Sequence, residues 1–186
     1  MNQSQQHLSV LFVYTSTDGQ TLTIIQKVAK RLQAHVRYDI VNLCEQTDVQ
    51  LSDYQLVVIG ASIRYGVFGS HLFQFVQQYY QQLNKMDSFF FSVSLIARKP
   101  EKRSPQTNVY TRKFLAKTPW KPKETFVFAG ALRYPIYRWY DKVMIKLIMK
   151  MTHGVTDSSQ DIEYTDWNEV EKFADHLLGY IQQKAL

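Results

Sequence analysis

The chain has little of what marks a small secreted scaffold or a disordered protein. Its 186 residues include one cysteine, Cys44, which excludes a disulfide framework and a cysteine-based zinc site. It has only 7 Gly and 5 Pro against 45% hydrophobic residues, which excludes disorder and favours one domain over residues 1–186. An uninterrupted apolar run of about 18 residues, as a spanning helix needs, does not occur. Residues 1–7 are polar with no basic flank leading to an apolar signal core, so we expect the protein to stay in the cytoplasm.

The net charge of +6 is concentrated in two short segments. Residues 98–103 carry four cations against Glu101, and residues 133–153 carry five against Asp141. Because these segments hold +3 and +4, the rest of the chain is nearly neutral. Localised positive charge indicates an anionic partner, and nucleic acid, an anionic membrane surface and an acidic small molecule all fit it.

Short apolar runs alternate with stretches of helical spacing along most of the chain. The runs predicted to be strands are residues 8–14, 36–41, 56–61, 89–96 and 125–131. The predicted helices are residues 21–34, 71–83, 106–117 and 166–183, with a short helix or loop around 45–52. Such alternation is typical of a parallel sheet covered on both faces. The sequence therefore predicts an α/β, doubly wound sheet of five strands.

The segment after the first strand has the composition of a phosphate-binding loop. It consists of Thr15, Ser16, Thr17, Asp18, Gly19, Gln20 and Thr21, and a helix begins where it ends. Hydroxyls and free backbone N–H groups donate to a phosphate, and the helix dipole favours its charge. The loop lacks the lysine of an ATP-binding loop and the three glycines of a dinucleotide fingerprint. An ordinary capped turn, with Thr17 or Asp18 as N-cap, is the alternative.

Two further strand ends are predicted at the same edge of the sheet, where open α/β folds bind ligands. One loop consists of Ser62, Ile63, Arg64, Tyr65 and Gly66; the other includes Ser92, Val93, Ser94, Leu95, Ala97 and Arg98. Their small residues let the backbone approach a planar ring, and Tyr65 offers a face for stacking. Taken singly, a tyrosine such as Tyr65 is more often a surface aromatic than a platform for a cofactor.

Residues 14–21 resemble the FMN phosphate loop of flavodoxins, with Asp18 where flavodoxins commonly carry a third hydroxyl. We expect the Asp18 side chain to point outward and cap the helix. Longer segments, residues 60–66, 97–103, 130–135 and 137–150, resemble the bacterial flavodoxin-like, quinone-dependent protoporphyrinogen IX dehydrogenases. This resemblance extends from about Leu8 to beyond Trp167.

The resemblance implies a flavodoxin-like sheet of order 2-1-3-4-5, with FMN as cofactor, held by the loops described above. It also implies FMN-dependent oxidation of protoporphyrinogen IX to protoporphyrin IX in haem biosynthesis. The resemblance further implies that ubiquinone or menaquinone accepts the electrons and that the protein lies peripherally on the cytoplasmic face of the inner membrane. The flavin carries the redox chemistry, so no catalytic side chain is assigned. We expect cationic and aromatic residues to bind the substrate propionates: Arg98, Lys99, Arg103, Arg133 and Tyr134.

Residues 132–160 exceed what a strand-helix alternation requires and form a predicted insertion. Tyr140, Val143, Met144 and Leu147 recur with helical spacing along one face. The residues predicted to meet an anionic membrane surface are Arg138, Trp139, Lys142, Lys146 and Lys150. An amphipathic helix of this kind suits a membrane interface, although the apolar face could instead pack on the domain.

Two other functions fit part of the sequence. An electron-carrying flavodoxin is typically acidic around the flavin, whereas this chain has two basic segments. Nucleic-acid binding would leave the apolar residues among the lysines facing water, so no nucleic-acid partner is expected. The five histidines show no metal-ligand spacing, so no metal is expected. The oligomeric state stays open, with a homo-oligomer possible.

Overall fold

A computed structural model of the chain describes residues 8–134, 137–151 and 161–184. The main sheet contains the parallel strands β1 (Leu8–Thr15), β2 (Val36–Asn42), β3 (Leu56–Arg64), β5 (Asp87–Ser94) and β6 (Glu124–Ala129). Their order is β2-β1-β3-β5-β6, and the short strand β4 (Val67–Phe68) pairs antiparallel with β3. Since β5 and β6 are the fourth and fifth parallel strands along the chain, the predicted order and fold class are confirmed.

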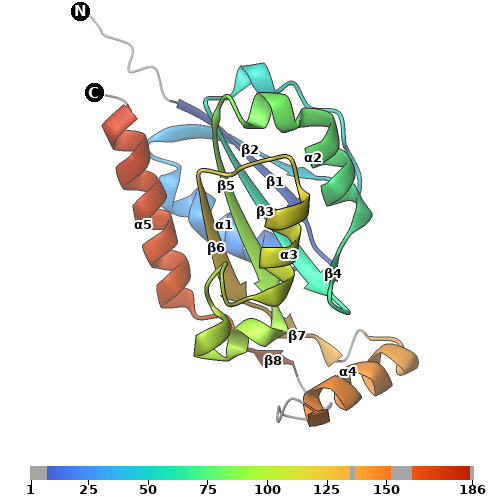
Figure 1. Ribbon diagram of the computed structural model, residues 1–186. Helices are drawn as coiled ribbons and strands as arrows, with labels where there is room; N and C mark the ends of the chain where they lie inside the picture. The colour runs from blue at the N-terminus through green and yellow to red at the C-terminus, as the bar shows by residue number, and fades with distance from the viewer. Residues whose placement is uncertain (1–7, 135–136, 152–160, 185–186) are drawn as a thin grey trace, which may run out of the picture.

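Helices cover both faces of this sheet (Figure 1). One face carries α1 (Gln20–Leu32) and α5 (Trp167–Lys184), and the other carries α2 (Ser70–Leu83) and α3 (Val109–Lys117). Alternate residues of β1 point to opposite faces of the sheet. Val10 and Phe12 pack with α1 and α5, whereas Leu11 and Val13 pack with α2 and α3. This two-sided burial explains why the strands are near-continuous apolar runs.

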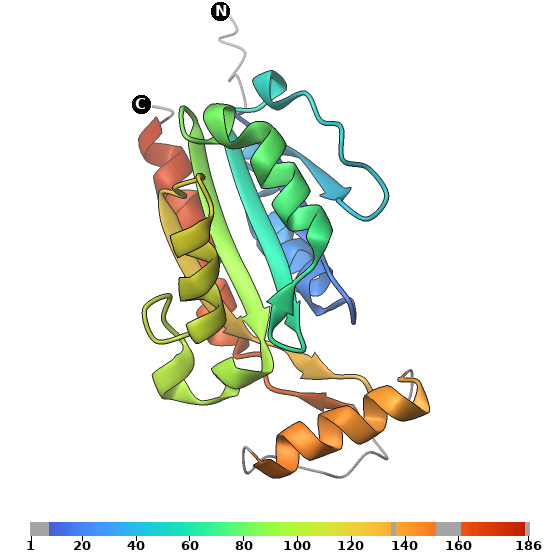
Figure 2. The ribbon, with the colours of Figure 1, turned by 45° about the vertical axis from the view of Figure 1, so that its right-hand side comes forward.

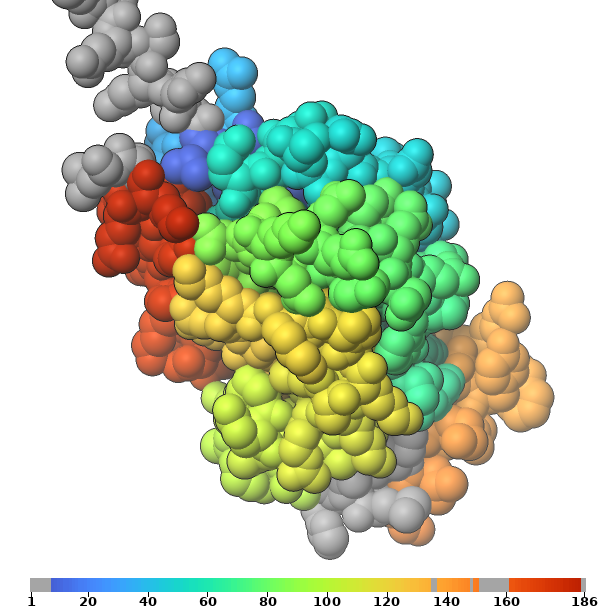
Figure 3. All heavy atoms as spheres, turned by 45° about the horizontal axis from the view of Figure 1, so that its top comes forward, coloured from blue at the N-terminus to red at the C-terminus, as the bar shows by residue number. Residues whose placement is uncertain are grey.

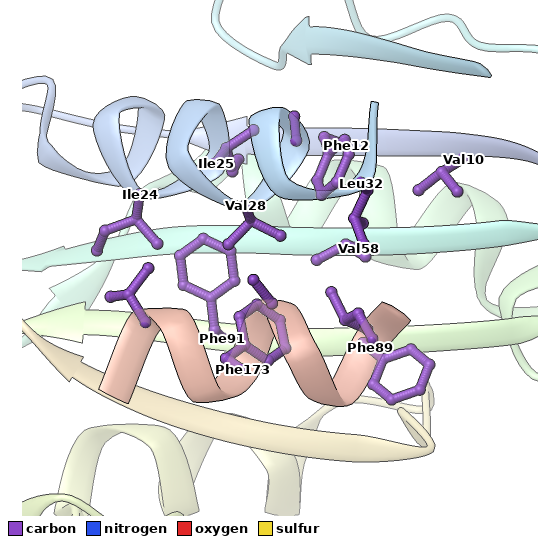
Figure 4. Close-up of a cluster of buried hydrophobic side chains, with 14 of the residues drawn as sticks. Val10, Phe12, Ile24, Ile25, Val28, Leu32, Val58, Phe89, Phe91 and Phe173 are labelled. Carbon is purple, nitrogen blue, oxygen red and sulfur yellow. The ribbon is translucent and has the colours of Figure 1, made fainter. Parts of the chain in front are cut away.

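The core between the sheet and the α1–α5 layer is rich in buried aromatic side chains (Figure 4). Val28 of α1 and Val58 of β3 are fully buried, and Phe173 of α5 meets Phe91 of β5 edge to face, 5.9 Å between ring centroids. Full burial of such a side chain contributes about 1.5 to 3 kcal/mol. These contacts hold the carboxyl ends of the strands, where the predicted site lies, in fixed positions.

Several element boundaries differ from the predictions. The fourth parallel strand ends at Ser94 rather than residue 96, because Leu95–Arg98 and Pro100–Lys102 turn into short 3-10 helices. Helix α3 begins at Val109 rather than residue 106, because the Asn108 side chain caps it by accepting from the Thr111 N–H at 3.2 Å. Residues 45–52, predicted to be a short helix or loop, are mostly loop, and a 3-10 turn, Leu51–Asp53, begins near their end.

After β6 the chain leaves the main sheet. Strands β7 (Ala131–Leu132) and β8 (Ile162–Glu163) pair antiparallel, and helix α4 (Trp139–Met151) lies between them in sequence. Residues 135–136 and 152–160 of the predicted insertion lie outside the described residues. Figure 2 shows α4 lying across the carboxyl ends of the strands, apart from the four helices that cover the sheet. Among the described residues, no helix is long and apolar enough to cross a membrane.

Candidate functional site

A pocket opens where the carboxyl ends of β1, β3 and β5 approach the inserted segment. Its lining residues come from the phosphate loop, the loops after β3 and β5, and the inserted segment. They are Ser16, Thr17, Asp18, Gln20, Ser62, Ile63, Arg64, Tyr65, Val93, Ser94, Leu95, Gly130, Ala131, Leu132, Tyr137 and Ile145. The three loops expected from the sequence therefore do converge on one edge of the sheet.

The segment that joins β1 to α1 carries hydrogen-bond donors that have no partner among the described residues. Gly19 stands at the N-cap of α1 with φ +81°, a left-handed conformation that favours glycine, and no side chain caps the helix. The hydroxyl oxygens of Thr15, Ser16 and Thr21 are buried and make no hydrogen bond with any described residue. Buried hydroxyls normally have partners, so three in one loop beside a helix N-terminus indicate a site for a phosphate or similar anion.

Asp18 does not cap the helix, which corrects the expectation for its side chain. It turns instead toward the inserted segment and accepts hydrogen bonds from Arg64 Nη1 at 2.8 Å and the Tyr137 hydroxyl at 2.7 Å. Tyr137 packs against the loop and is only 7% exposed, which brings its hydroxyl to Asp18. Pairing with Arg64 offsets the negative charge that Asp18 would otherwise place beside a phosphate.

Arg64 joins the phosphate loop to helix α4. Besides Asp18, its Nη2 is 3.2 Å from Asp141 Oδ1, and the Tyr65 hydroxyl donates to the same Asp141 oxygen. The guanidinium carbon lies 5.2 Å from the ring centroid of Tyr65 and 4.9 Å from that of Tyr137. Arg64 thus contacts two carboxylates and the faces of two tyrosines, and such contacts hold its planar group in one orientation.

The charges of this network are mutually reinforcing. Burial disfavours the Arg64 cation, but the Asp18 carboxylate and the contacts with Tyr65 and Asp141 outweigh it and raise the pKa of Arg64. The Tyr65 hydroxyl, and then Arg64, lower the pKa of Asp141 against the opposing effect of its burial. Burial, and then Asp18, raise the pKa of Tyr137, so its phenol stays protonated and donates. At neutral pH, Arg64 is therefore a cation held between two anions.

Tyr65 adopts a backbone conformation that indicates a constrained turn. Arg64 pairs with Val67 in the β3–β4 hairpin, which leaves Tyr65 and Gly66 as its two-residue turn, with φ +50° and +82°. Both positions of such a turn require positive φ, which suits glycine and is unfavourable for tyrosine. The turn nevertheless places the Tyr65 ring beside Arg64 at the pocket.

The loop after β5 is held from behind by a buried polar network. The Asn108 side chain is fully buried and donates to the Ser94 hydroxyl at 3.1 Å, so the start of α3 fixes Ser94 at the pocket wall. Ser92 turns away from the pocket and shares a 2.7 Å hydrogen bond with Thr111. Asn108 was not among the residues predicted for the site.

Gln20 fastens the phosphate loop to the inserted hairpin. Its side-chain amide donates to Glu163 and Thr165, both at 2.9 Å, and its oxygen accepts from Arg133 Nη2 at 3.1 Å. Arg133 is further paired with Asp161 at 2.8 Å. Of the two inserted residues predicted for the substrate, Arg133 therefore braces the hairpin, and Tyr134 is fully buried.

The predicted cofactor residues divide into two groups. Those that line the pocket are Ser16, Thr17, Asp18, Gln20, Ser62, Ile63, Arg64, Tyr65, Val93, Ser94 and Leu95. Those that do not are Gly19, Thr21, Gly66, Ser92, Ala97 and Arg98. Thr21 still belongs to the anion-binding loop through its buried, unpaired hydroxyl.

The basic segment after β5 lies off the pocket wall. Arg103 forms an ion pair with Asp166 at 3.1 Å, donates to the Ala97 carbonyl and faces a separate groove beside β6 and α5. Arg98 donates to the Leu95 carbonyl at 3.0 Å, and neither Arg98 nor Lys99 lines the pocket. The expectation that this segment forms the rim of the pocket therefore receives no support from the geometry.

Several residues of the site were missed at the level of sequence. Leu132, Tyr137 and Ile145 line the pocket, and Asp141 reaches it through Arg64. One feature of the sequence pointed to Asp141, which is the sole acid among five cations in residues 133–153. An isolated acid in a basic segment calls for a specific partner, and here that partner is Arg64.

Helix α4 has two different apolar sides. Ile145 and Met149 are buried against Leu132, Tyr134 and Tyr137. The opposite side leaves large apolar side chains exposed: Trp139 (77%), Tyr140 (44%), Val143 (57%), Met144 (46%) and Leu147 (51%). In the space-filling view, part of α4 projects beyond the rounded outline of the molecule (Figure 3). One side of α4 thus packs on the domain, as one of the two sequence alternatives predicted, and the other side is exposed. We call the five exposed residues the α4 stripe.

The fold and the pocket define a flavodoxin-like protein, and residues 11–159 match the flavodoxin domain family. More narrowly, the chain belongs to the family of protoporphyrinogen IX dehydrogenases [quinone]. The Escherichia coli protein of that name is 49% identical over 168 residues, which cover 90% of this chain and 93% of that protein. The Leishmania major protein of that name is 48% identical over 166 residues, covering 88% and 72%. Membership confirms the family resemblance read from the sequence.

Among solved structures, a Fusobacterium nucleatum flavodoxin bound to flavin mononucleotide is similar at 10% sequence identity, with a TM-score of 0.39. The similarity covers 63% of this chain and 77% of that chain.

Proposed function

We propose that this chain is an FMN-dependent oxidoreductase that oxidises protoporphyrinogen IX to protoporphyrin IX, with ubiquinone or menaquinone as electron acceptor. The observation that carries this proposal is the 49% identity to the Escherichia coli protoporphyrinogen IX dehydrogenase [quinone] over 90% of the chain. The activity places the protein in haem biosynthesis. When bound, FMN supplies the two-electron chemistry, and the full oxidation requires three such steps.

The residues of the pocket fit FMN. The buried hydroxyls of Thr15, Ser16 and Thr21 and the N-terminus of α1 satisfy a phosphate monoester, which is what their lack of partners calls for. Residues 62–65 and 93–95, which line the pocket, would hold the flavin ring. Apolar side chains on the pocket wall, among them Val93, Leu95 and Ile145, exclude water from that space.

The protein's own groups position rather than react. Asn108 fixes Ser94, and Gln20 ties the phosphate loop to the inserted hairpin, so both walls of the pocket are set before a ligand arrives. Arg64 forms ion pairs with Asp18 of the phosphate loop and with Asp141 of α4, so one cation links the two segments. No catalytic acid or base is assigned among these residues.

The α4 stripe is proposed to dock on an anionic membrane surface at the cytoplasmic face of the inner membrane. Lys142, Lys146 and Lys150 flank the stripe, and the structure gives them no ion pair with any described residue. Apolar side chains beside unpaired cations match a lipid interface. The apolar side chains insert into the interface, and the cations meet anionic headgroups. The protein then sits peripherally where a lipid-dissolved quinone is within reach.

Anaerobic mixing tests the proposed reaction. FMN-loaded protein is mixed with protoporphyrinogen IX, and the flavin absorbance is followed before and after addition of a quinone. We expect substrate to bleach the flavin and quinone to restore its colour, with protoporphyrin formed. A flavin that stays oxidised with this substrate but is reduced by a redox partner protein would identify an electron carrier instead.

A further inference from the structure

Arg64 is the sole basic side chain on the pocket wall among the described residues. Its side chain is 23% exposed, so it is shielded from solvent without being sealed off. A guanidinium in such surroundings is a strong carboxylate ligand, because its fork can bind two oxygens in one plane.

The two sides of this fork hold carboxylates of different origin. Asp18, from the phosphate loop, takes Nη1 at 2.8 Å. Asp141, from α4, takes Nη2 at 3.2 Å and also accepts from the Tyr65 hydroxyl. The carboxylate of Asp141 therefore occupies a small site made of a guanidinium and a phenol, and that guanidinium lies over the rings of Tyr65 and Tyr137.

Arg133 and Arg103 are engaged elsewhere. Arg133 is held by Asp161 and Gln20, and Arg103 is held by Asp166 on the side of β6 and α5. An anionic ligand that enters the pocket therefore meets Arg64 first. A flat apolar ligand that carries carboxylates would also find the Tyr65 ring there, since that residue is 48% exposed.

We propose that Arg64, together with the Tyr65 hydroxyl, binds a carboxylate of the tetrapyrrole substrate, and that Asp141 holds this place until the substrate displaces it. This inference rests on the proposed function, which supplies a substrate with two propionates. The exchange replaces one carboxylate by another on the same guanidinium, so the cation is never left unpaired. Asp141 lies in the first turn of α4, and its side chain is 16% exposed while it is paired with Arg64.

The exchange makes opposite predictions for the two residues. Removing the charge of Arg64 removes the anchor and weakens binding of the carboxylate ligand. Removing the charge of Asp141 removes an internal competitor and strengthens it. If the network were merely structural, both changes would loosen the pocket and weaken binding together.

The test uses protoporphyrin IX and its dimethyl ester, which shares the macrocycle but lacks the carboxylates. FMN-loaded protein is titrated with each ligand in the dark, and binding is followed by porphyrin fluorescence. We expect Arg64→Gln to lose about tenfold in affinity for the free acid and Asp141→Asn to gain several-fold, with affinity for the ester unchanged in both. Asp161→Asn, which breaks the Arg133 ion pair in the same inserted segment, is the matched control and should bind both ligands as the wild type does.

Arg64→Gln also leaves Asp18 without its cation, so its FMN content is measured alongside. Asp141→Asn keeps the Arg64–Asp18 pair and retains the test if Arg64→Gln loads FMN poorly. Weaker binding of the free acid by Asp141→Asn, or wild-type protein that binds acid and ester equally, would overturn the assignment of Arg64. Failure of the wild type to bind either ligand would instead remove the proposed function on which the assignment rests.

Discussion

Helices α1 and α4 are both 13 residues long and amphipathic, yet they use their apolar residues in opposite ways. α1 buries its apolar face completely between the sheet and α5, through Ile24, Ile25, Val28, Ala29 and Leu32. α4 buries Ile145 and Met149 but leaves the α4 stripe exposed. The first helix forms part of the core, whereas the second leaves most of its large apolar side chains exposed.

Their cations differ in the same sense. Lys27 and Arg31 of α1 pair with Glu171 and Asp175 of α5, both at 2.8 Å. Lys142, Lys146 and Lys150 of α4 have no ion-pair partner within the described part of the chain. The cations of α1 thus link two helices of the fold, whereas those of α4 stay available to an external anion.

The largest effect is expected from a matched pair of valines, one on each helix. Val28 of α1 is fully buried and Val143 of α4 is 57% exposed. Val28→Asp buries an unpaired charge and should cost at least about 4 kcal/mol, enough to unfold the domain or nearly so. Val143→Asp should leave the free energy of unfolding within about 0.5 kcal/mol of the wild type. Urea unfolding measures both, and a comparable loss in the two variants would show that α4 is part of the core.

A second effect concerns the cations of the inserted segment. Replacing Arg138, Lys142, Lys146 and Lys150 by Gln should weaken binding to anionic vesicles by about 1 kcal/mol per cation at low salt. The residual binding should depend less on salt concentration. Lys27, Lys30 and Arg31 of α1 give a control variant when replaced by Gln, because the partners of two of them lie within the fold. Equal losses per cation removed in the two variants would mean that net charge, rather than α4, governs attraction to the membrane.

A smaller effect is expected in the phosphate loop, which belongs to the body of the fold. Ser16→Ala and Thr21→Ala each remove a buried hydroxyl that has no partner among the described residues. Each should weaken FMN by roughly 1 to 3 kcal/mol in a fluorescence titration, while the FMN-free protein loses little stability. Ser104→Ala is a control, since its hydroxyl bonds locally to Thr107. Unchanged FMN affinity in the double variant Ser16→Ala, Thr21→Ala would place the phosphate elsewhere.

Local patterns were sufficient to predict the fold class, whereas the strand order came from the resemblance to flavodoxins. Each strand is a short apolar run and each covering helix has one apolar face, so burial on both sides of a sheet follows from neighbours in sequence. The phosphate loop was predictable for the same reason, because residues 15–21 are consecutive. Even Asp18 was recognised as unusual there.

The pairing of charges was not predictable from local sequence. Asp18 meets Arg64 and Tyr137, and Arg64 meets Asp141, over separations that only the folded chain brings together. Counting charge within a segment made Arg103 and Arg133 look available, although their partners Asp166 and Asp161 lie outside those segments. The two sides of α4 were indistinguishable for a related reason, since hydrophobic spacing does not reveal which side meets the hairpin.

Reoxidation of the flavin by quinone tests the central claim most directly. Chemically reduced, FMN-loaded wild type and Val143→Asp are mixed anaerobically with a quinone dissolved in anionic vesicles, or with a short-chain quinone in solution. The account predicts that Val143→Asp is reoxidised at least about tenfold more slowly by the vesicle quinone and at the wild-type rate by the soluble quinone. Equal rates for the two proteins with the vesicle quinone would contradict it, and would assign the α4 stripe to another contact, such as a second copy of the chain.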